Sequence, residues 1–187
     1  MIKPVELRTK RLILRQWKPE DYPHFARINA DPEVMSFYPR TLSENESNQM
    51  ADKLKCLISL RGWGLWAVET ITGREFIGFV GLHEPRDDLP VTPCVEIGWR
   101  LDKSHWGHGY ATEAAQACLK YAFDVIDLTE VYSFASLVNI KSYAVMQRLN
   151  MLDTGNNFEH PNFPQGHEYA EHVLYKITKE QWFSDAG

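Results

Sequence analysis

Apolar and polar positions change their period several times along the chain, and each change marks a predicted element. A helix start at Pro19 and a capping box formed by Ser43 and Glu46 predict two helices near the N-terminus. Alternating positions on both sides of Thr72-Gly73 predict a hairpin. The full set comprises predicted strands 9–17, 65–69, 76–83, 94–101, 131–137 and 169–177, and predicted helices 19–30, 44–60, 110–126 and 139–149.

The order of these elements predicts the fold class. One strand and two helices precede three strands expected to be antiparallel, and helix, strand, helix, strand follow. This order favours a mixed α/β sheet over a doubly wound parallel one. The chain has 187 residues without a repeat or linker, so we expect one domain over residues 1–187.

The pattern also assigns faces and turns. Strand 94–101 should place Val95, Ile97, Trp99 and Leu101 on one face, and Cys94, Glu96, Gly98 and Arg100 on the other. The buried stripe of helix 110–126 should comprise Ala111, Ala114, Ala115, Cys118, Ala122 and Val125. We expect a turn at Asp87, Asp88 and Pro90, and a left-handed residue at Asn150.

Composition limits the cellular compartments and the kinds of partner that we expect. Apolar residues make up 44% of the chain and charged residues 24%, as in ordinary globular proteins. The sequence shows no signal peptide and no apolar run long enough for a membrane, and its three dispersed cysteines favour a reducing compartment. We therefore expect a cytoplasmic protein, monomeric or homodimeric, without a membrane partner. The net charge of −5 argues against nucleic acid.

The segment RLDKSHWGHGYATEAA, residues 100–115, carries the most chemistry. A strand ends, a loop with Gly107 and Gly109 follows, and an amphipathic helix begins at once. Glycine lets backbone approach a ligand, and the first helical turn offers unpaired N–H groups to an anion such as a pyrophosphate. A plain turn is the alternative. A Rossmann fingerprint would need a third glycine where Thr112 stands, and a P-loop would need Gly-Lys-Ser/Thr.

The same residues resemble a known signature. Trp106-Gly107-His108-Gly109-Tyr110-Ala111 is similar to the acyl-CoA-binding motif Gln/Arg-x-x-Gly-x-Gly/Ala of the GNAT N-acetyltransferases, with Trp106 departing at its first position. Asn139 and Ser142 resemble the second signature of that family. With Thr112-Glu113-Ala114, the pattern is similar to the ribosomal-protein alanine N-acetyltransferase branch and its small-molecule relatives.

The resemblance implies a fold, a cosubstrate and its contacts. The GNAT fold has a largely antiparallel mixed sheet, flanked by helices, with a V-shaped splay between two central strands, here 94–101 and 131–137. The pantetheine arm of acetyl-CoA would lie in that splay. Its expected contacts are Ile97, Gly98, Trp99, Trp106, Gly107, His108, Gly109, Tyr110, Ala111, Thr112, Asn139 and Ser142. Phe37-Tyr38-Pro39 would form a rim over the acceptor cleft.

Three side chains are candidates for catalysis in the reaction that the resemblance implies. Attack of a primary amine on a thioester needs a base, and Glu96 is the first candidate because it alternates away from the apolar face of its strand. His83 is the second, since imidazole changes its charge near neutral pH. Many relatives protonate the thiolate with a tyrosine where this chain has Met146, which leaves Ser142 as the donor. Each has a structural alternative: a solvated or Arg100-paired Glu96, an incidental His83, and a small packing residue at Ser142.

The expected function is acetyl transfer from acetyl-CoA to a primary amine, either a protein N-terminus or a small molecule, by direct attack in a ternary complex. A non-catalytic acyl-CoA-binding or sensor module is the alternative, and a nucleotide-binding oxidoreductase is a third possibility. None of the seven histidines and three cysteines shows zinc spacing, so we expect no metal.

Overall fold

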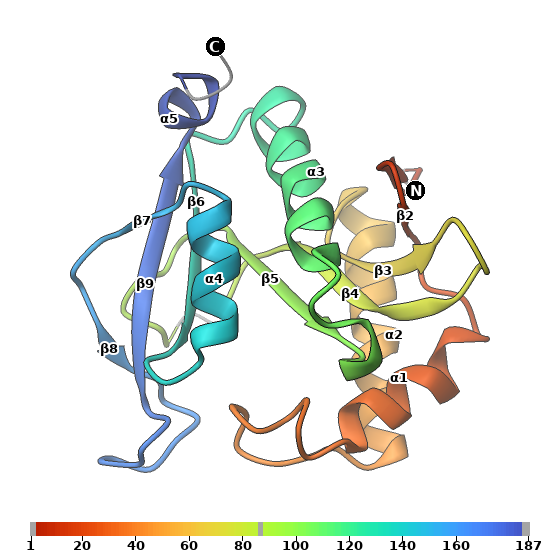
Figure 1. Cartoon of the computed structure of the whole chain (residues 1–187), viewed down its shortest axis with the longest axis horizontal. Helices are drawn as coiled ribbons and strands as arrows, with labels where there is room; N and C mark the ends of the chain where they lie inside the picture. The colour runs from red at the N-terminus through yellow and green to blue at the C-terminus, as the bar shows by residue number, and fades with distance from the viewer. Residues whose placement is uncertain (1–2, 86–87, 185–187) are drawn as a thin grey trace. The chain divides into compact units, whose positions relative to one another are not determined.

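The computed structural model describes residues 3–85 and 88–184. The chain divides into two compact units (Figure 1). Unit 1 comprises residues 1–82 and 98–118, and unit 2 comprises residues 83–97 and 119–187. The chain passes between them within three elements: β4 (Phe76–His83), β5 (Glu96–Leu101) and α3 (Tyr110–Asp124).

The strands of unit 1 pair in chain order. β1 (Leu7–Arg8), β2 (Leu12–Arg15), β3 (Leu65–Thr70) and β4 are antiparallel to their successive neighbours. The hairpin of β3 and β4 is confirmed. The predicted strand 9–17 is confirmed only over Leu12–Arg15, because the Thr9 N–H donates to the carbonyl of Leu12 at 3.0 Å and turns the chain between β1 and β2.

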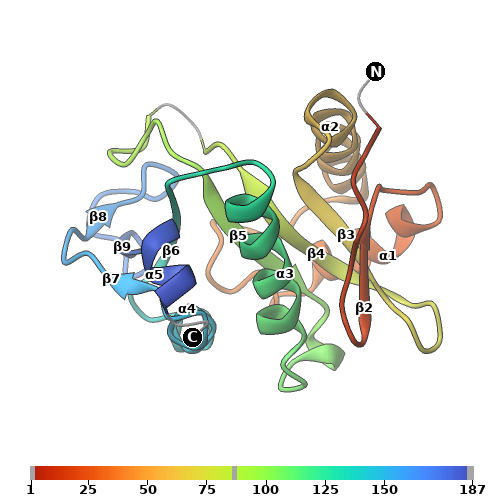
Figure 2. The same cartoon turned by 90° about the horizontal axis from the view of Figure 1, so that it is seen from above.

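The two helices of unit 1 follow the predicted ones closely. α1 spans Asp21–Ala30 and α2 spans Glu44–Arg61. The capping box is confirmed, since the Ser43 hydroxyl accepts from the Glu46 N–H and the Glu46 carboxylate accepts from the Ser43 N–H. α2 ends at Gly62, whose φ of 84° suits glycine. α1 packs against α2, and α2 against β3 (Figure 2).

Four aromatic residues form the centre of the unit 1 core. Trp17 and Phe25 meet edge to face with 4.8 Å between ring centroids, and Phe76 lies 5.5 Å from Trp17. Phe25 also contacts Phe79 at 5.9 Å. The indole N–H of Trp17 donates to the carbonyl of Leu65, so its polar atom is satisfied inside the core. These contacts fix α1 on the strands.

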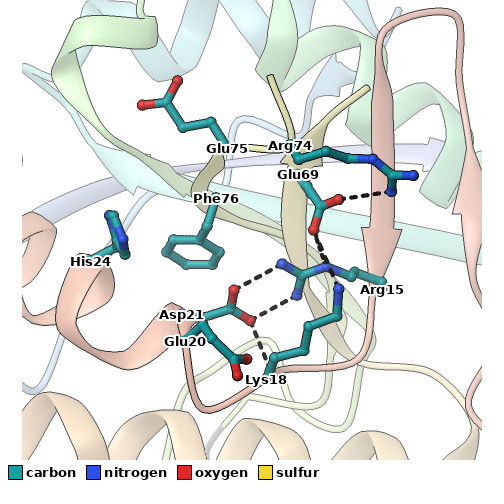
Figure 3. Close-up of a pocket in the computed structure, with 9 residues that line it drawn as sticks. All are labelled: Arg15, Lys18, Glu20, Asp21, His24, Glu69, Arg74, Glu75 and Phe76. Carbon is teal, nitrogen blue, oxygen red and sulfur yellow. Dashed lines mark hydrogen bonds and ion pairs between the residues drawn. The ribbon is translucent and has the colours of Figure 1, made fainter. Parts of the chain in front are cut away.

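A buried ion-pair network lies beside this core (Figure 3). The Arg15 guanidinium donates to both carboxylate oxygens of Asp21, at 2.7 and 2.8 Å, and to Glu69 at 2.6 Å. Arg74 reaches the other oxygen of Glu69 at 3.2 Å. A pocket of about 540 Å³ opens next to the network, lined by charges of both signs and by Phe76. Burial alone would raise the pKa of Glu69, but the bonds and charges of the neighbouring cations outweigh it and lower that pKa.

Glu69→Gln should therefore destabilise unit 1 and flatten its response to acid. A carboxyl whose pKa is lowered by folding contributes stability above its ordinary value of 4.5, and that stability is lost as the pH falls through the folded value. We expect the free energy of unfolding to fall by about 3 kcal/mol at pH 7, because the buried Arg15 would then have Asp21 as its one remaining carboxylate partner. Urea unfolding at pH 7 and pH 4 measures both effects. The matched control is Glu6→Gln, whose exposed pair with Arg8 should contribute little; equal losses in both variants would contradict the prediction.

Unit 2 is built on two long strands. β6 (Glu130–Ser136) and β9 (Glu171–Thr178) pair antiparallel along their whole length (Figure 1). The short strands β7 (Leu152–Asp153) and β8 (Phe158–Glu159) both pair with β9. α4 (Ile140–Arg148) follows β6, and α5 (Lys179–Ser184) follows β9. The pattern did not predict β7, β8 or α5, which are too short to show a period.

Helix α3 agrees with its predicted stripe only in part. Ala114, Ala115, Cys118 and Ala122 are fully buried, as predicted. Ala111 is only half-buried, and Val125 is exposed. The prediction for Val125 is wrong because the helix ends at Asp124, and the N–H groups of residues 125 and 126 both turn back to the carbonyl of Tyr121.

Of the smaller predictions on strand boundaries and turns, some are confirmed and others are wrong. β5 begins at Glu96 rather than at Cys94, and β9 begins at Glu171 rather than at residue 169. Asn150 has a φ of 57°, so the left-handed conformation is confirmed. Asp88 and Pro90 lie in a turn, while Asp87 lies outside the described residues.

The predicted fold class is confirmed as mixed α/β, with a mostly antiparallel sheet flanked by helices. β5 and β6 pair in parallel, and their register comprises the pair Glu96 and Tyr132. Among the described residues, none of the helices combines the length and the apolar character that crossing a membrane requires.

Candidate active site

The glycine loop of unit 1 leads directly into α3. A short 3₁₀ turn, Lys103–His105, follows β5 and is capped by Asp102, whose carboxylate accepts from the Ser104 N–H at 2.9 Å. Gly107 and Gly109 then both adopt a φ of 77°, a left-handed conformation that side chains rarely take. These two glycines place the loop backbone immediately before the first turn of the helix.

The backbone N–H groups of this loop are available to a ligand. The first helical hydrogen bond runs from the Glu113 N–H to the carbonyl of Gly109, at 3.0 Å. Within the described ranges, the N–H groups of residues 107–112 donate to no protein acceptor. Nothing lies within 4 Å of the position that a Cβ on Gly107 would occupy. Six successive donors at the positive end of a helix dipole suit a pyrophosphate group.

Arg11 adds a cation that the sequence pattern did not reveal. One of its terminal nitrogens lies 3.6 Å from the position of a Cβ on Gly109, and its guanidinium carbon lies 4.7 Å from the centroid of the Tyr110 ring. The Arg11 Nε donates to Glu113 at 2.6 Å. Burial would raise the pKa of Glu113, but the hydrogen bonds from Thr9 and Arg11 outweigh it and lower that pKa, so the carboxylate stays charged and holds Arg11.

In unit 2 the two candidate bases touch each other. The Nε2 atom of His83, the last residue of β4, lies 2.8 Å from Oε2 of Glu96, the first residue of β5. The side chain of Glu96 is 10% exposed and that of His83 is 31% exposed. The buried carboxylate therefore contacts an imidazole that solvent can reach. In such a pair the histidine can accept a proton, and the glutamate carboxylate can stabilise the positive charge of the imidazolium that forms.

The residues of β5 that we predict to contact the cofactor differ in burial and in hydrogen bonding. The carbonyl of Ile97 accepts from the Ser133 hydroxyl at 3.0 Å, and the side chain of Ile97 is fully buried. Gly98 and Trp99 are half-buried. The Ile97 carbonyl is thus already satisfied within unit 2, and the expected cofactor contacts of the strand stay predictions.

Asn139 caps α4. Its side-chain oxygen accepts from the Ser142 N–H at 3.2 Å, which confirms the N-cap role. Ser142 is half-buried, and Met146 is fully buried. The phenol of Tyr143 donates to the carbonyl of Leu137 at 2.6 Å. Over residues 3–85 and 88–184, the Ser142 hydroxyl forms no hydrogen bond with another residue.

The candidate residues thus form separate groups. Unit 1 brings Trp106, Gly107, His108, Gly109, Tyr110, Ala111 and Thr112 together with Arg11. Unit 2 brings His83 to Glu96, and Asn139 to Ser142. In the part of the chain that the structure describes, no three His, Cys, Asp or Glu side chains form a group that could hold a metal ion.

Comparison with known proteins gives consistent matches. The model of the family described as Acetyltransferase (GNAT) domain matches residues 11–152. The FsC-acetyl coenzyme A-N(2)-transacetylase of Aspergillus fumigatus is 33% identical over 186 residues, which cover 94% of this chain and 77% of that protein. An acetyltransferase (GNAT family) structure from Bacillus anthracis superposes with a TM-score of 0.78 at 25% identity, covering 94% of this chain and 99% of that one.

A third match concerns the fold alone. The structure of spermidine N-acetyltransferase from Vibrio cholerae, in complex with CoA and spermine, superposes with a TM-score of 0.72 at 20% identity. The match covers 92% of this chain and 98% of that chain.

Proposed function

Because this chain belongs to the GNAT acetyltransferase family, we propose that it transfers the acetyl group of acetyl-CoA to a primary amine by direct attack in a ternary complex. N-acetyltransferase activity follows from the family itself, and acetyltransferases of this fold use acetyl-CoA. The observation that carries the proposed mechanism is the pair of His83 and Glu96 at 2.8 Å. A module that only binds acyl-CoA would need no such base.

In the proposed reaction, His83, Glu96 and Ser142 handle the proton and the charges that develop. The neutral amine attacks the thioester carbonyl carbon, a C–N bond forms, and the C–S bond breaks. The proton leaving the amine nitrogen goes to His83, with Glu96 stabilising the imidazolium. The departing sulfur accepts a hydrogen bond from the Ser142 hydroxyl and takes its proton from water, while the His83 imidazolium returns its proton to solvent. Acetyl-CoA supplies the activated acetyl group, and the protein supplies the base, the hydrogen-bond donor and the orientation.

The glycine loop is proposed to hold the cosubstrate. The free N–H groups of residues 107–112 would bind the pyrophosphate, and Arg11 would add a positive charge beside them. The remainder of acetyl-CoA, beyond its pyrophosphate, would contact four other predicted residues: Ile97, Gly98, Trp99 and Asn139. The family resemblance supports these assignments.

Direct attack is favoured over an acetyl-cysteine intermediate. Cys94 lies two residues before Glu96 and is the cysteine nearest the proposed base in the sequence. Burial, followed by the charges of Glu96 and Glu130, raises the pKa of its thiol to about 11. Only about one thiol in ten thousand would then be ionised at pH 7. Cys94 is therefore a poor nucleophile, and the amine must reach the thioester itself.

The proposal also covers the domain organisation, the cellular compartment and the acceptor. We propose that residues 1–187 act as one acetyltransferase domain, since the family match crosses both units. Three free cysteines support a reducing cytoplasm. The acceptor would be a protein N-terminus, as in the ribosomal-protein branch that the signatures resemble, or a small-molecule amine.

A panel of amines with acetyl-CoA, read by the release of free thiol, tests this function. Turnover with at least one primary amine is expected, and CoA should raise the melting temperature whereas NAD(P)H should not. CoA binding without acetylation of any amine or N-terminal peptide would favour the non-catalytic module. Stabilisation by NAD(P)H alone would contradict the proposed cosubstrate.

Ser142→Ala should slow turnover by roughly 5- to 150-fold, the equivalent of about 1–3 kcal/mol from a hydrogen bond to the departing sulfur. The effect is limited because a thiolate with an ordinary pKa of about 8.5 already leaves fairly well. The Michaelis constant for the amine should change little. The matched control is Ser184→Ala, at the end of α5, whose hydroxyl bonds to the Glu180 carbonyl. Full activity of Ser142→Ala at saturating substrates would contradict the hydrogen bond to the sulfur.

A further inference from the structure

Arg100 carries a buried positive charge whose partners are all uncharged. It is the second-last residue of β5 and is 7% exposed. One terminal nitrogen donates to the side-chain oxygen of Asn29 at 2.6 Å. The guanidinium carbon lies 4.1 Å from the centroid of the Tyr38 ring and 5.4 Å from that of Phe79. All of these residues belong to unit 1.

The contrast with Arg15 shows what Arg100 lacks. Both arginine residues are 7% exposed, but Arg15 meets the two carboxylates of Asp21 and Glu69. Over residues 3–85 and 88–184, Arg100 forms no ion pair, and its buried Nε has no hydrogen-bond partner. Burying a cation without a counter-charge is costly, so such a residue is expected to have a functional partner.

The surroundings hold the guanidinium in one orientation. The amide nitrogen of Asn29 donates to the Ser47 hydroxyl at 2.8 Å, which leaves the amide oxygen facing Arg100. Asn29 and Ser47 are both fully buried. One side of the guanidinium is therefore fixed by an amide that is itself fixed, while the edge that carries Nε is unused. An arginine edge of this kind matches the two oxygens of a carboxylate.

The charge lies one side chain below the surface. Tyr38, which stacks on Arg100, is 38% exposed and belongs to the segment of turns between α1 and α2, drawn in orange in Figure 1. The contacts of Arg100 come from α1, this segment, β4 and, through the sulfur of Met50 at 3.8 Å, α2. The glycine loop instead contacts Arg11 in the turn before β2, so the surroundings of Arg100 are distinct from those of the glycine loop.

We propose that Arg100 recognises a carboxylate on the acceptor, so that the preferred substrate is an amine that also carries a carboxylate. This inference rests on the proposed acetyl transfer and specifies its acceptor class. The Nε edge of Arg100 holds the carboxylate, and Asn29 positions the guanidinium. Tyr38 covers the bound group, as expected for a residue of the predicted rim.

Matched pairs of amines test the proposal. Each ω-amino carboxylate, from two to eight carbons, is compared with the amine of the same length that lacks the carboxylate, with thiol release as the readout. The wild-type protein should favour the carboxylate at one best chain length by about 10-fold or more in kcat/KM. Arg100→Gln should remove this preference, mainly through a higher KM, without weakening CoA binding. Arg100→Lys should restore the preference only partly, because it lacks the fork.

A second variant avoids reliance on the loss of Arg100. Asn29→Asp places a carboxylate against the guanidinium and should compete with the substrate, lowering the preference at least several-fold while the side-chain shape is kept. If the wild-type protein acetylates no amine, the proposed function fails. If it acetylates both members of every pair equally well, the function stands and the carboxylate inference is wrong. Weaker CoA binding in folded Arg100→Gln would show that the cation serves the cosubstrate instead, which also overturns the inference.

Discussion

Gly109→Val should weaken CoA binding by at least about 100-fold, or roughly 2.7 kcal/mol, while the protein stays folded. Gly109 has a φ of 77°, which a β-branched residue adopts only with strain. The loop would relax toward negative φ, and the N–H groups of residues 107–112 would change their directions. A valine side chain would also extend toward Arg11, whose terminal nitrogen is 3.6 Å from the Cβ position. Titration calorimetry with CoA measures the loss.

Gly73→Val is the matched control for this experiment. Gly73 has a φ of 86° in the turn between β3 and β4, and the space around its Cβ position is also open. The two variants should therefore lose similar stability, but only the change at Gly109 should affect CoA. Near-normal CoA affinity in folded Gly109→Val would show that the loop does not bind the pyrophosphate. Equal losses of affinity in both variants would indicate a general effect of destabilisation.

The features that the sequence predicted well are those decided by neighbouring residues. The capping box of Ser43 and Glu46 spans four residues, and its two hydrogen bonds form within one helical turn. Asn150 takes its left-handed conformation directly after α4. The glycines at 107 and 109 likewise depend on the backbone immediately around them. Such features depend on local interactions and need no long-range contact.

The features that the sequence missed depend on residues distant along the chain. The turn at Thr9 is held by Glu113, since the Thr9 hydroxyl donates to that carboxylate at 2.6 Å across more than a hundred residues. The same carboxylate places Arg11 beside the glycine loop. Arg100 was weighed as a partner for Glu96 on one strand face, but it bonds to Asn29 of α1 instead. No period or spacing in the sequence reports such pairings.

Glu96→Gln and His83→Gln should each lower kcat by about 100-fold or more, with little change in CoA affinity. The sequence offered these residues as competing bases, and their contact at 2.8 Å supports the proposal that they act as one pair. Gln keeps the approximate shape of Glu96 but cannot compensate an imidazolium, and Gln in place of His83 cannot take the proton. Because the two side chains act together, Glu96→Gln/His83→Gln should be about as slow as the slower single variant.

The double-variant cycle separates this pair from two independent contributions, which would multiply to about 10,000-fold or more. Glu130→Gln on β6 is the matched control, since Glu130 is also a unit 2 carboxylate but pairs with Lys176 and Tyr132. Its turnover should stay within about two-fold of the wild type, because exposed pairs contribute little. The rate of the wild-type protein should rise with pH as the amine loses its proton, and the variants should keep that part of the profile. Full activity of Glu96→Gln together with a slow His83→Gln would make His83 act alone. Full activity of both would leave bulk water as the base.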